Sequence, residues 1–267
     1  MTHAPRDRRG ERGRHNLPLA TLDPASLEVV IPRLSSTWIE RSKVLATPTR
    51  PLRALYFPET AVVSVARRVG RRRIPVMSIG NEGIVGHWLD AAAGGQVAVD
   101  VVCVVPGHAL RLPVRYLGEA ILARPAVREL IAEVTQSAMV QLMQNVMCEK
   151  IHALPARCAR ILMELTHTLG SVFELTHEEL AALLSATRPS TTRVMNWLAA
   201  DAIIEYARGT IRVLDLAALE ARSCGCYGTL LARRQRLLRL VSPGRPDHHH
   251  DVGPAARASR AVAGARP

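Results

Sequence analysis

The sequence is poor in aromatic residues and has no long apolar run. Aromatic residues make up only 3% of the chain although 48% of its residues are hydrophobic, which describes a soluble protein rich in Ala, Val and Leu. No apolar stretch approaches the roughly 20 residues that a membrane-spanning helix needs. The charged N-terminus is not followed by the apolar segment of a secretory signal. We therefore predict a cytoplasmic protein with no membrane partner.

The sequence also lacks the motifs that mark common classes of enzyme. It has no P-loop, no Gly-x-Gly-x-x-Gly turn, no Gly-x-Ser-x-Gly elbow and no His-Glu-x-x-His helix. The five cysteines are an odd number and lie mostly in apolar segments, which favours buried free thiols in a reducing compartment. We predict that the chain is not an enzyme.

The net charge of +12 is concentrated at the two ends of the chain. Residues 1–15 hold five arginines and two acidic residues, and residues 231–267 hold eight arginines and two aspartates. We interpret residues 1–16 and 231–267 as disordered basic tails. Such tails attract DNA phosphates without sequence preference, but they serve equally well as solubilising ends.

The segment from Leu175 to Asp215 carries the strongest functional signal. Thr176 is a candidate helix N-cap with Glu179 three residues later, which is the pattern of a capping box. Three leucines then share one helix face, namely Leu180, Leu183 and Leu184. After a short break, Pro189 has the fixed φ that suits the first turn of a second helix. The segment therefore predicts two helices joined by a tight turn.

The second predicted helix has a packed face and a polar face. We assign Val194, Trp197 and Leu198 to the packed face. The N-terminal half is rich in hydroxyl and arginine side chains, which reach phosphates and base edges when such a helix lies in the DNA major groove. A hairpin with its own arginines follows and completes a winged helix-turn-helix. The predicted DNA-contacting residues are Thr176, His177, Arg188, Ser190, Thr191, Thr192, Arg193, Asn196, Arg208 and Arg212.

Upstream of this unit the sequence pattern changes twice along the chain. Short β-type runs separated by Gly and Pro extend to about Pro113, which predicts a compact β-domain within residues 17–123. An uninterrupted helix is expected in residues 124–153, followed by a hinge at Leu154-Pro155. Residues 154–230 then form the winged domain. The predicted fold class is α+β.

The long predicted helix needs a packing partner along its length. The simplest partner is the same helix of a second copy across a two-fold axis. In that arrangement Ser137, Gln141 and Asn145 lie in the seam and fix its register. The alternative is a helix that packs only on its own β-domain.

This order of elements resembles the Crp/Fnr family of transcription regulators over roughly residues 17–230. Tyr56–Val65 is similar to the early part of that family's β-roll, and Met77–Gly86 to its glycine-rich turn. In the winged segment, Arg188 and Arg193 occupy the two arginine positions of the family's recognition helix. The resemblance implies a cyclic-nucleotide-binding-like β-roll, a homodimer and double-stranded DNA as partner, and it allows RNA polymerase as a further partner.

The resemblance also points to an effector pocket in the β-roll. The predicted pocket residues are Gly83, Ile84, Val85, Gly86 and His87. Cyclic-nucleotide binders of the family hold the phosphate with a Gly-Glu pair and a following arginine, but this turn lacks that glutamate and residues 94–105 contain no arginine. A cyclic phosphate would therefore have no countercharge. No cysteine precedes Cys103, so the cluster of the iron–sulfur branch is missing as well. We predict no cofactor and no cyclic-nucleotide effector.

The pair Cys224 and Cys226 does not fit this scheme. Two thiols one residue apart can chelate a metal or form a strained disulfide. Without a second pair of ligands we favour two semi-exposed cysteines in a C-terminal turn and assign no metal site. Two alternatives stay open: a redox- or metal-sensing regulator that acts through Cys224 and Cys226, and a protein-interaction module that no longer binds DNA.

Overall fold

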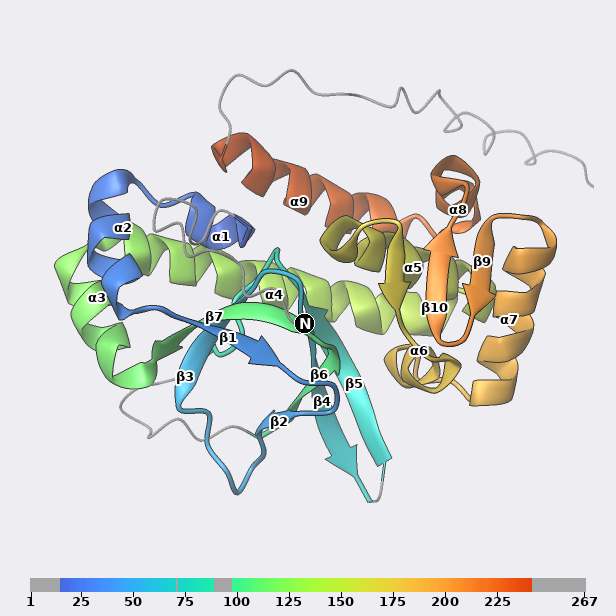
Figure 1. The fold of residues 1–267 in the computed structure, drawn as a ribbon, viewed down its shortest axis with the longest axis horizontal. Coiled ribbons are helices and arrows are strands. Elements are labelled where there is room, and N and C mark those ends of the chain that lie inside the picture. The colour runs from blue at the N-terminus through green and yellow to red at the C-terminus, as the bar shows by residue number, and fades with distance from the viewer. Residues whose placement is uncertain (1–14, 71, 89–97, 242–267) are drawn as a thin grey trace, which may run out of the picture.

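The computed structural model describes residues 15–70, 72–88 and 98–241 and arranges them in two connected parts (Figure 1). The N-terminal part begins with two short helices, α1 (Leu17–Ala20) and α2 (Pro24–Val30). The side chains of Asn16 and Asp23 cap these helices, because each accepts a hydrogen bond from a backbone N–H of the first turn. A short 3₁₀ turn (Ile31–Arg33) then leads into the strands.

Among the described residues, the N-terminal part contains two antiparallel sheets. One has the strand order β1-β7-β3 and the other the order β2-β6-β4-β5. The strands are β1 (Ser35–Ile39), β2 (Val44–Ala46), β3 (Ala54–Pro58), β4 (Val62–Val69), β5 (Arg72–Ile79), β6 (Asp100–Val105) and β7 (Gly107–Pro113). Their Val- and Leu-rich inner faces form the buried core of this part. These sheets, with the helices that follow, confirm the predicted α+β fold.

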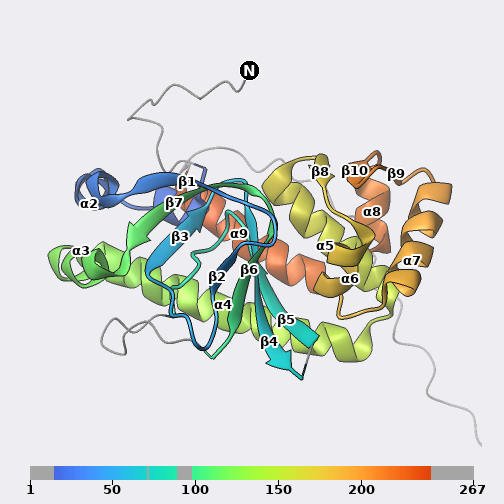
Figure 2. The ribbon, with the colours of Figure 1, turned by 60° about the horizontal axis from the view of Figure 1, so that its bottom comes forward.

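A long helix connects this part to the next. After a 3₁₀ turn (Val114–Tyr116) and the short helix α3 (Leu117–Ala123), α4 (Pro125–Ile151) runs past both parts of the chain (Figures 1 and 2). One face of α4 packs on the sheets. Its buried residues include Val127, Leu130, Val134, Ala138 and Gln141.

Two residues that we assigned to a dimer seam lie on this packed face instead. The side-chain amide of Gln141 donates to the carbonyl of Ser78 (3.1 Å), and that of Asn145 donates to the carbonyl of Val76 (3.0 Å). Both carbonyls belong to β5, which is an edge strand with backbone groups that need partners. The seam assignment of Gln141 and Asn145 is therefore wrong.

The opposite face of α4 exposes a row of apolar side chains over its C-terminal half. We call this row the apolar stripe of α4. It consists of Met139, Val140, Met143, Val146, Met147 and Ile151, which are between 37% and 67% exposed. Exposed residues at helical spacing, three, four and seven positions apart, form one continuous surface.

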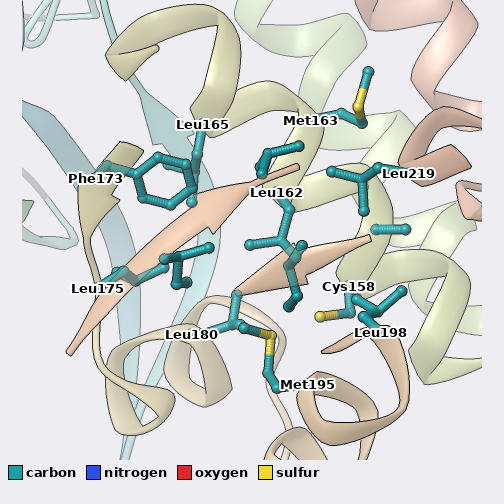
Figure 3. Packing of buried hydrophobic residues seen from close by; sticks show 14 of the residues in the cluster. Cys158, Leu162, Met163, Leu165, Phe173, Leu175, Leu180, Met195, Leu198 and Leu219 are labelled. Atoms are coloured by element: carbon teal, nitrogen blue, oxygen red, sulfur yellow. The ribbon is translucent and has the colours of Figure 1, made fainter. Parts of the chain in front are cut away.

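The C-terminal part is a winged unit with a three-stranded sheet, and it begins directly after α4. Its elements are α5 (Leu154–Leu169), β8 (Val172–Glu174), α6 (His177–Leu183), α7 (Arg188–Ala200), β9 (Ile204–Ala207), β10 (Thr210–Val213) and α8 (Leu216–Arg222), with the sheet order β8-β10-β9. Figure 3 shows its core, in which Leu162, Leu180 and Leu198 come from three different helices and are fully buried. The core holds α6 and α7 in fixed relative positions.

The last described helix, α9 (Cys226–Val241), leaves the winged unit and returns to the N-terminal part (Figure 1). The guanidinium of Arg234 donates to the side chain of Asn81 (2.9 Å) and to the carbonyl of His167 (2.7 Å), so it touches both parts. Arg236 lies 3.5 Å from Glu133 of α4. The prediction of a disordered tail from residue 231 is thus wrong up to Val241; residues 242–267 and 1–14 lie outside the described residues. None of the described helices combines the length and apolarity needed to cross a membrane.

Candidate nucleic-acid interface

The first helix of the helix-turn-helix is fixed by the predicted capping box. The hydroxyl of Thr176 accepts a hydrogen bond from the N–H of Glu179 (3.2 Å), and the Glu179 carboxylate accepts one from the N–H of Thr176 (2.8 Å). Both bonds satisfy backbone donors that the first turn of a helix leaves unpaired. Leu180 and Leu184 are fully buried, so α6 is anchored on the core by its middle and by its C-terminal end.

The second helix, α7, presents most of its polar residues to solvent. Thr187 caps it by accepting a hydrogen bond from Ser190 N, and Pro189 lies in its first turn. Arg188, Arg193 and Asn196 are exposed. These donors therefore lie on the outside of a helix whose other side is held by the core.

Two assignments on α7 need correction. Trp197, predicted to be in the packed face, is 40% exposed; its ring is covered by the guanidinium of Arg222 at 4.4 Å, while Met195 is buried in its place. Thr191, predicted to contact DNA, is fully buried, and its hydroxyl has no hydrogen-bond partner among the described residues. The reason is the helical period: Thr191, Val194, Met195 and Leu198 share one face, and Trp197 lies at its edge.

The remaining predicted contacts on the two helices are linked to one another. The ring of His177 stacks on Tyr206 at 4.0 Å, and its Nδ1 lies 3.0 Å from the Thr192 hydroxyl. Burial, and next the positive charge of Arg188, lower the pKa of His177, which favours the neutral form of the ring. Arg193 lies within 3.4 Å of the Ser190 hydroxyl. These contacts limit the freedom of side chains at the surface of the two helices.

The wing places the two further predicted arginines. β9 and β10 are joined by Arg208 and Gly209, which both have positive φ (51° and 83°). A two-residue turn of this kind matches the right-handed twist of the two strands. Arg208 is exposed at the tip. Arg212 is exposed on β10 and pairs with Glu205 across the hairpin (3.3 Å). Nine of the ten predicted DNA contacts thus reach the surface, with Thr191 as the exception.

Residues 156–222 match the family described as the Crp-like helix-turn-helix domain. The chain carries a Crp-like helix-turn-helix domain. Over 65 residues it is 35% identical to the Cyclic AMP receptor protein of Thermus thermophilus, a match that covers 24% of this chain and 30% of that relative. The match therefore spans less than a third of the relative's length.

Solved structures extend the similarity of the fold to about seven tenths of the chain. The chain superposes on FixK2 from Bradyrhizobium japonicum with a TM-score of 0.61 at 13% identity, over 72% of this chain and 98% of the other. It also superposes on TTHB099, a transcriptional regulator of the CRP family from Thermus thermophilus, with a TM-score of 0.58 at 21% identity, over 70% and 96%. The predicted resemblance to the Crp/Fnr family is confirmed by sequence for the helix-turn-helix domain and by structure for the fold.

The predicted effector turn lies in the core. Ile84 and Val85 are fully buried, and Val85 exchanges backbone hydrogen bonds with Tyr56. The Nδ1 of His87 lies 3.0 Å from the hydroxyl of Thr135 on α4. Residues 89–97, which follow the turn, lie outside the described residues, so the effector pocket at residues 83–87 stays a prediction.

A cavity of about 110 Å³ lies elsewhere, at the junction of β5, α4, α5 and α9. Its lining includes Gln141, Arg160, His167, Tyr227 and Arg234, and none of the predicted effector residues. His167 stacks on Tyr227, and its Nε2 lies 2.6 Å from the phenol oxygen. Burial, followed by the charge of Arg234, lowers the pKa of His167 to about 4.

The two cysteines of the C-terminal turn are buried rather than semi-exposed. Cys224 and Cys226 are 6% and 4% exposed, and they meet Cys148 of α4, which is fully buried. The expectation of semi-exposed thiols is therefore wrong. Burial raises the pKa of Cys148 to about 12, although the nearby charge of Arg160 acts in the opposite direction. No sequence signal placed Cys148 in this cluster, because it is 76 residues away from Cys224.

Proposed function

We propose that the chain is a DNA-binding transcription regulator that binds a two-fold symmetric operator as a homodimer. The observation that carries the proposal is α7, which exposes Arg188, Arg193 and Asn196 while its other face is locked into the core. Bidentate contact of arginine with guanine is the commonest specific contact in the major groove. We also propose a cytoplasmic location and leave RNA polymerase as a possible partner.

The apolar stripe of α4 supports the homodimer. Six neighbouring apolar side chains are exposed there at helical spacing, and a continuous apolar surface of this kind is typical of an interface. Parallel pairing of two copies of the stripe, about a two-fold axis that runs along α4, would place the two winged units on one side of the dimer. Their recognition helices must lie about 34 Å apart to enter successive major grooves.

The test of the proposal is a selection of bound duplexes from a random DNA pool by the purified full-length protein. We expect a two-fold symmetric motif whose half-sites are about 10 base pairs apart, and binding that weakens steeply with salt. If folded, dimeric protein enriches no motif with or without cell extract, the DNA-binding proposal is wrong. In that case the winged unit is better explained as a protein-interaction module.

We expect Arg188→Ala to weaken operator binding by about 1–3 kcal/mol, or roughly 5- to 140-fold, and to relax the preference at one base pair of each half-site. The reason is loss of a bidentate contact to a base edge. Binding isotherms on the selected operator and on its single-base variants measure both effects. Arg50→Ala, which removes the same charge from an exposed position of the β-domain, should have little effect. Equal losses on unrelated DNA would show that Arg188 touches only phosphate.

A further inference from the structure

Three buried cysteines from two distant segments meet where α4 ends and α9 begins. Cys148 lies three residues before the end of α4, whereas Cys224 and Cys226 lie on either side of the start of α9. The sulfur atoms of Cys148 and Cys224 are 3.5 Å apart, and all three sulfurs lie within 4.8 Å of one another. All three cysteines are free thiols. We call this group the trithiol cluster.

The spacing of the trithiol cluster fits a metal ion better than a disulfide. A tetrahedral ion with metal–sulfur bonds of about 2.3 Å keeps its sulfurs about 3.8 Å apart. The cluster therefore needs only small side-chain movements to reach that geometry. A disulfide requires two sulfurs to close to about 2.05 Å and would leave the third cysteine without a partner.

Two positive groups near the cluster offset part of the cost of burying negative charge there. A divalent ion with three thiolates carries a net charge of about −1. The guanidinium of Arg160 is only 6% exposed, pairs with Glu164 on one side, and has an Nε without a hydrogen-bond partner among the described residues. Its charge acts on Cys148 and Cys224. Cys226 is the first residue of the 16-residue helix α9, whose N-terminal dipole stabilises a thiolate.

We propose that Cys148, Cys224 and Cys226 form a binding site for a thiophilic d¹⁰ cation, with Zn²⁺ as the occupant and the fourth position open to water or an external ligand. Binding forms three metal–sulfur bonds and releases the three thiol protons to solvent, with no change in oxidation state. Sulfur ligands select such cations over Mg²⁺ or Ca²⁺. This proposal is independent of DNA binding, because the cluster lies outside the surface formed by α6, α7 and the wing.

The position of the site gives the ion a structural consequence. The ion would cross-link the end of α4 to the start of α9 and so close the junction between the two parts of the chain. Ala156, in the first turn of α5, packs against the cluster, so the beginning of the winged unit is part of the same junction. Occupancy would therefore restrain the winged unit relative to α4.

The test is a titration of the full-length, fully reduced, metal-free protein with Co²⁺ and then Zn²⁺ under anaerobic conditions. We expect one Co²⁺ per chain with an intense thiolate-to-metal absorption band, its displacement by one Zn²⁺, and release of protons on binding. Mg²⁺ should produce no change. A folded, reduced protein that binds neither Co²⁺ nor Zn²⁺ stoichiometrically overturns the proposal.

Serine substitutions identify the ligands. We expect Cys148→Ser, Cys224→Ser and Cys226→Ser each to weaken Zn²⁺ binding by about 100-fold or more, since loss of a direct ligand should cost at least as much as loss of a supporting contact. Cys103→Ser, at another buried cysteine, is the matched control and should bind Zn²⁺ like the wild type. Unchanged binding in the three variants would place the metal elsewhere and reject the site.

A second readout does not depend on folded variants. Zn²⁺ should protect Cys148, Cys224 and Cys226 of the wild-type protein from alkylation, as mapped by mass spectrometry, and should leave the alkylation of Cys103 and Cys158 unchanged. Equal alkylation of all five cysteines with and without Zn²⁺ contradicts the proposal. If a disulfide forms rapidly within the cluster in air and saturating Zn²⁺ does not slow its formation, the cluster has a redox role and the proposed metal site is wrong.

Discussion

Replacing Met143 with glutamate should convert the proposed dimer into monomers at micromolar concentration. Met143 lies in the middle of the apolar stripe of α4 and is 56% exposed in the single chain. In a two-fold pairing of the stripe, each glutamate would be buried without a partner and close to the glutamate of the other copy. Burying an unpaired charge costs about 3 kcal/mol or more, which raises the dimer dissociation constant by roughly 100-fold. Analytical ultracentrifugation measures this change directly.

The control for this substitution is Val69→Glu. Val69 has a similar exposure of 58% but lies at the end of β4, away from α4, so its replacement should leave the dimer intact. Operator binding by Met143→Glu should fall as well, because a monomer contacts only one half-site. A Met143→Glu protein that sediments as a dimer would show that the stripe is not the interface.

Lowering the pH from 7 to 4 should reduce the free energy of unfolding by about 3 kcal/mol through His167 alone. The pKa of this residue is about 4 in the folded protein, against 6.5 as its ordinary value. A difference of this size corresponds to about 3 kcal/mol. Above pH 6.5 both states are neutral; between pH 6.5 and 4 the unfolded chain takes up the proton first, so stability is lost across that window.

The His167 effect is isolated by comparing the wild type with His167→Gln in urea unfolding at several pH values. Glutamine keeps a side chain that can hydrogen-bond to Tyr227 but does not titrate, so the variant should lose less stability on acidification. The groups that face His167 are Tyr227 and Arg234 of α9 and Glu82 of the β-domain, and they are the same in both proteins. Identical profiles for the wild type and His167→Gln would contradict the prediction.

Local sequence signals predicted the helix-turn-helix well because its determinants are close together in the chain. The capping box of Thr176 and Glu179 and the proline in the first turn of α7 each act within one turn of helix. The periodicity of α7 was less informative at its boundary. It assigned Trp197 to the packed face and Thr191 to the polar face. In the structure the buried face is rotated toward Thr191, so Thr191 is buried and Trp197 is partly exposed.

The long helix α4 shows a different limit. Its sequence is apolar on more than one face. Periodicity therefore identifies the apolar faces of the helix but not which part of the protein packs on each of them. Gln141 and Asn145 looked suited to a polar seam, yet β5 is an edge strand and takes their amides. The cluster of Cys148, Cys224 and Cys226 was missed for a related reason, since it depends on a tertiary contact between segments far apart in the sequence.

The return of α9 limits how freely the winged unit can move. The unit is joined to the rest of the chain at residues 152–153, and again where Arg234 holds the side chain of Asn81. Arg41 of the β-domain adds a further attachment, because it pairs with Glu174 of β8 and Glu179 of α6. A rigid body held at several separate points can turn only when some of those attachments break. Any signal that changes the separation of two recognition helices in a dimer must therefore exchange contacts at this junction.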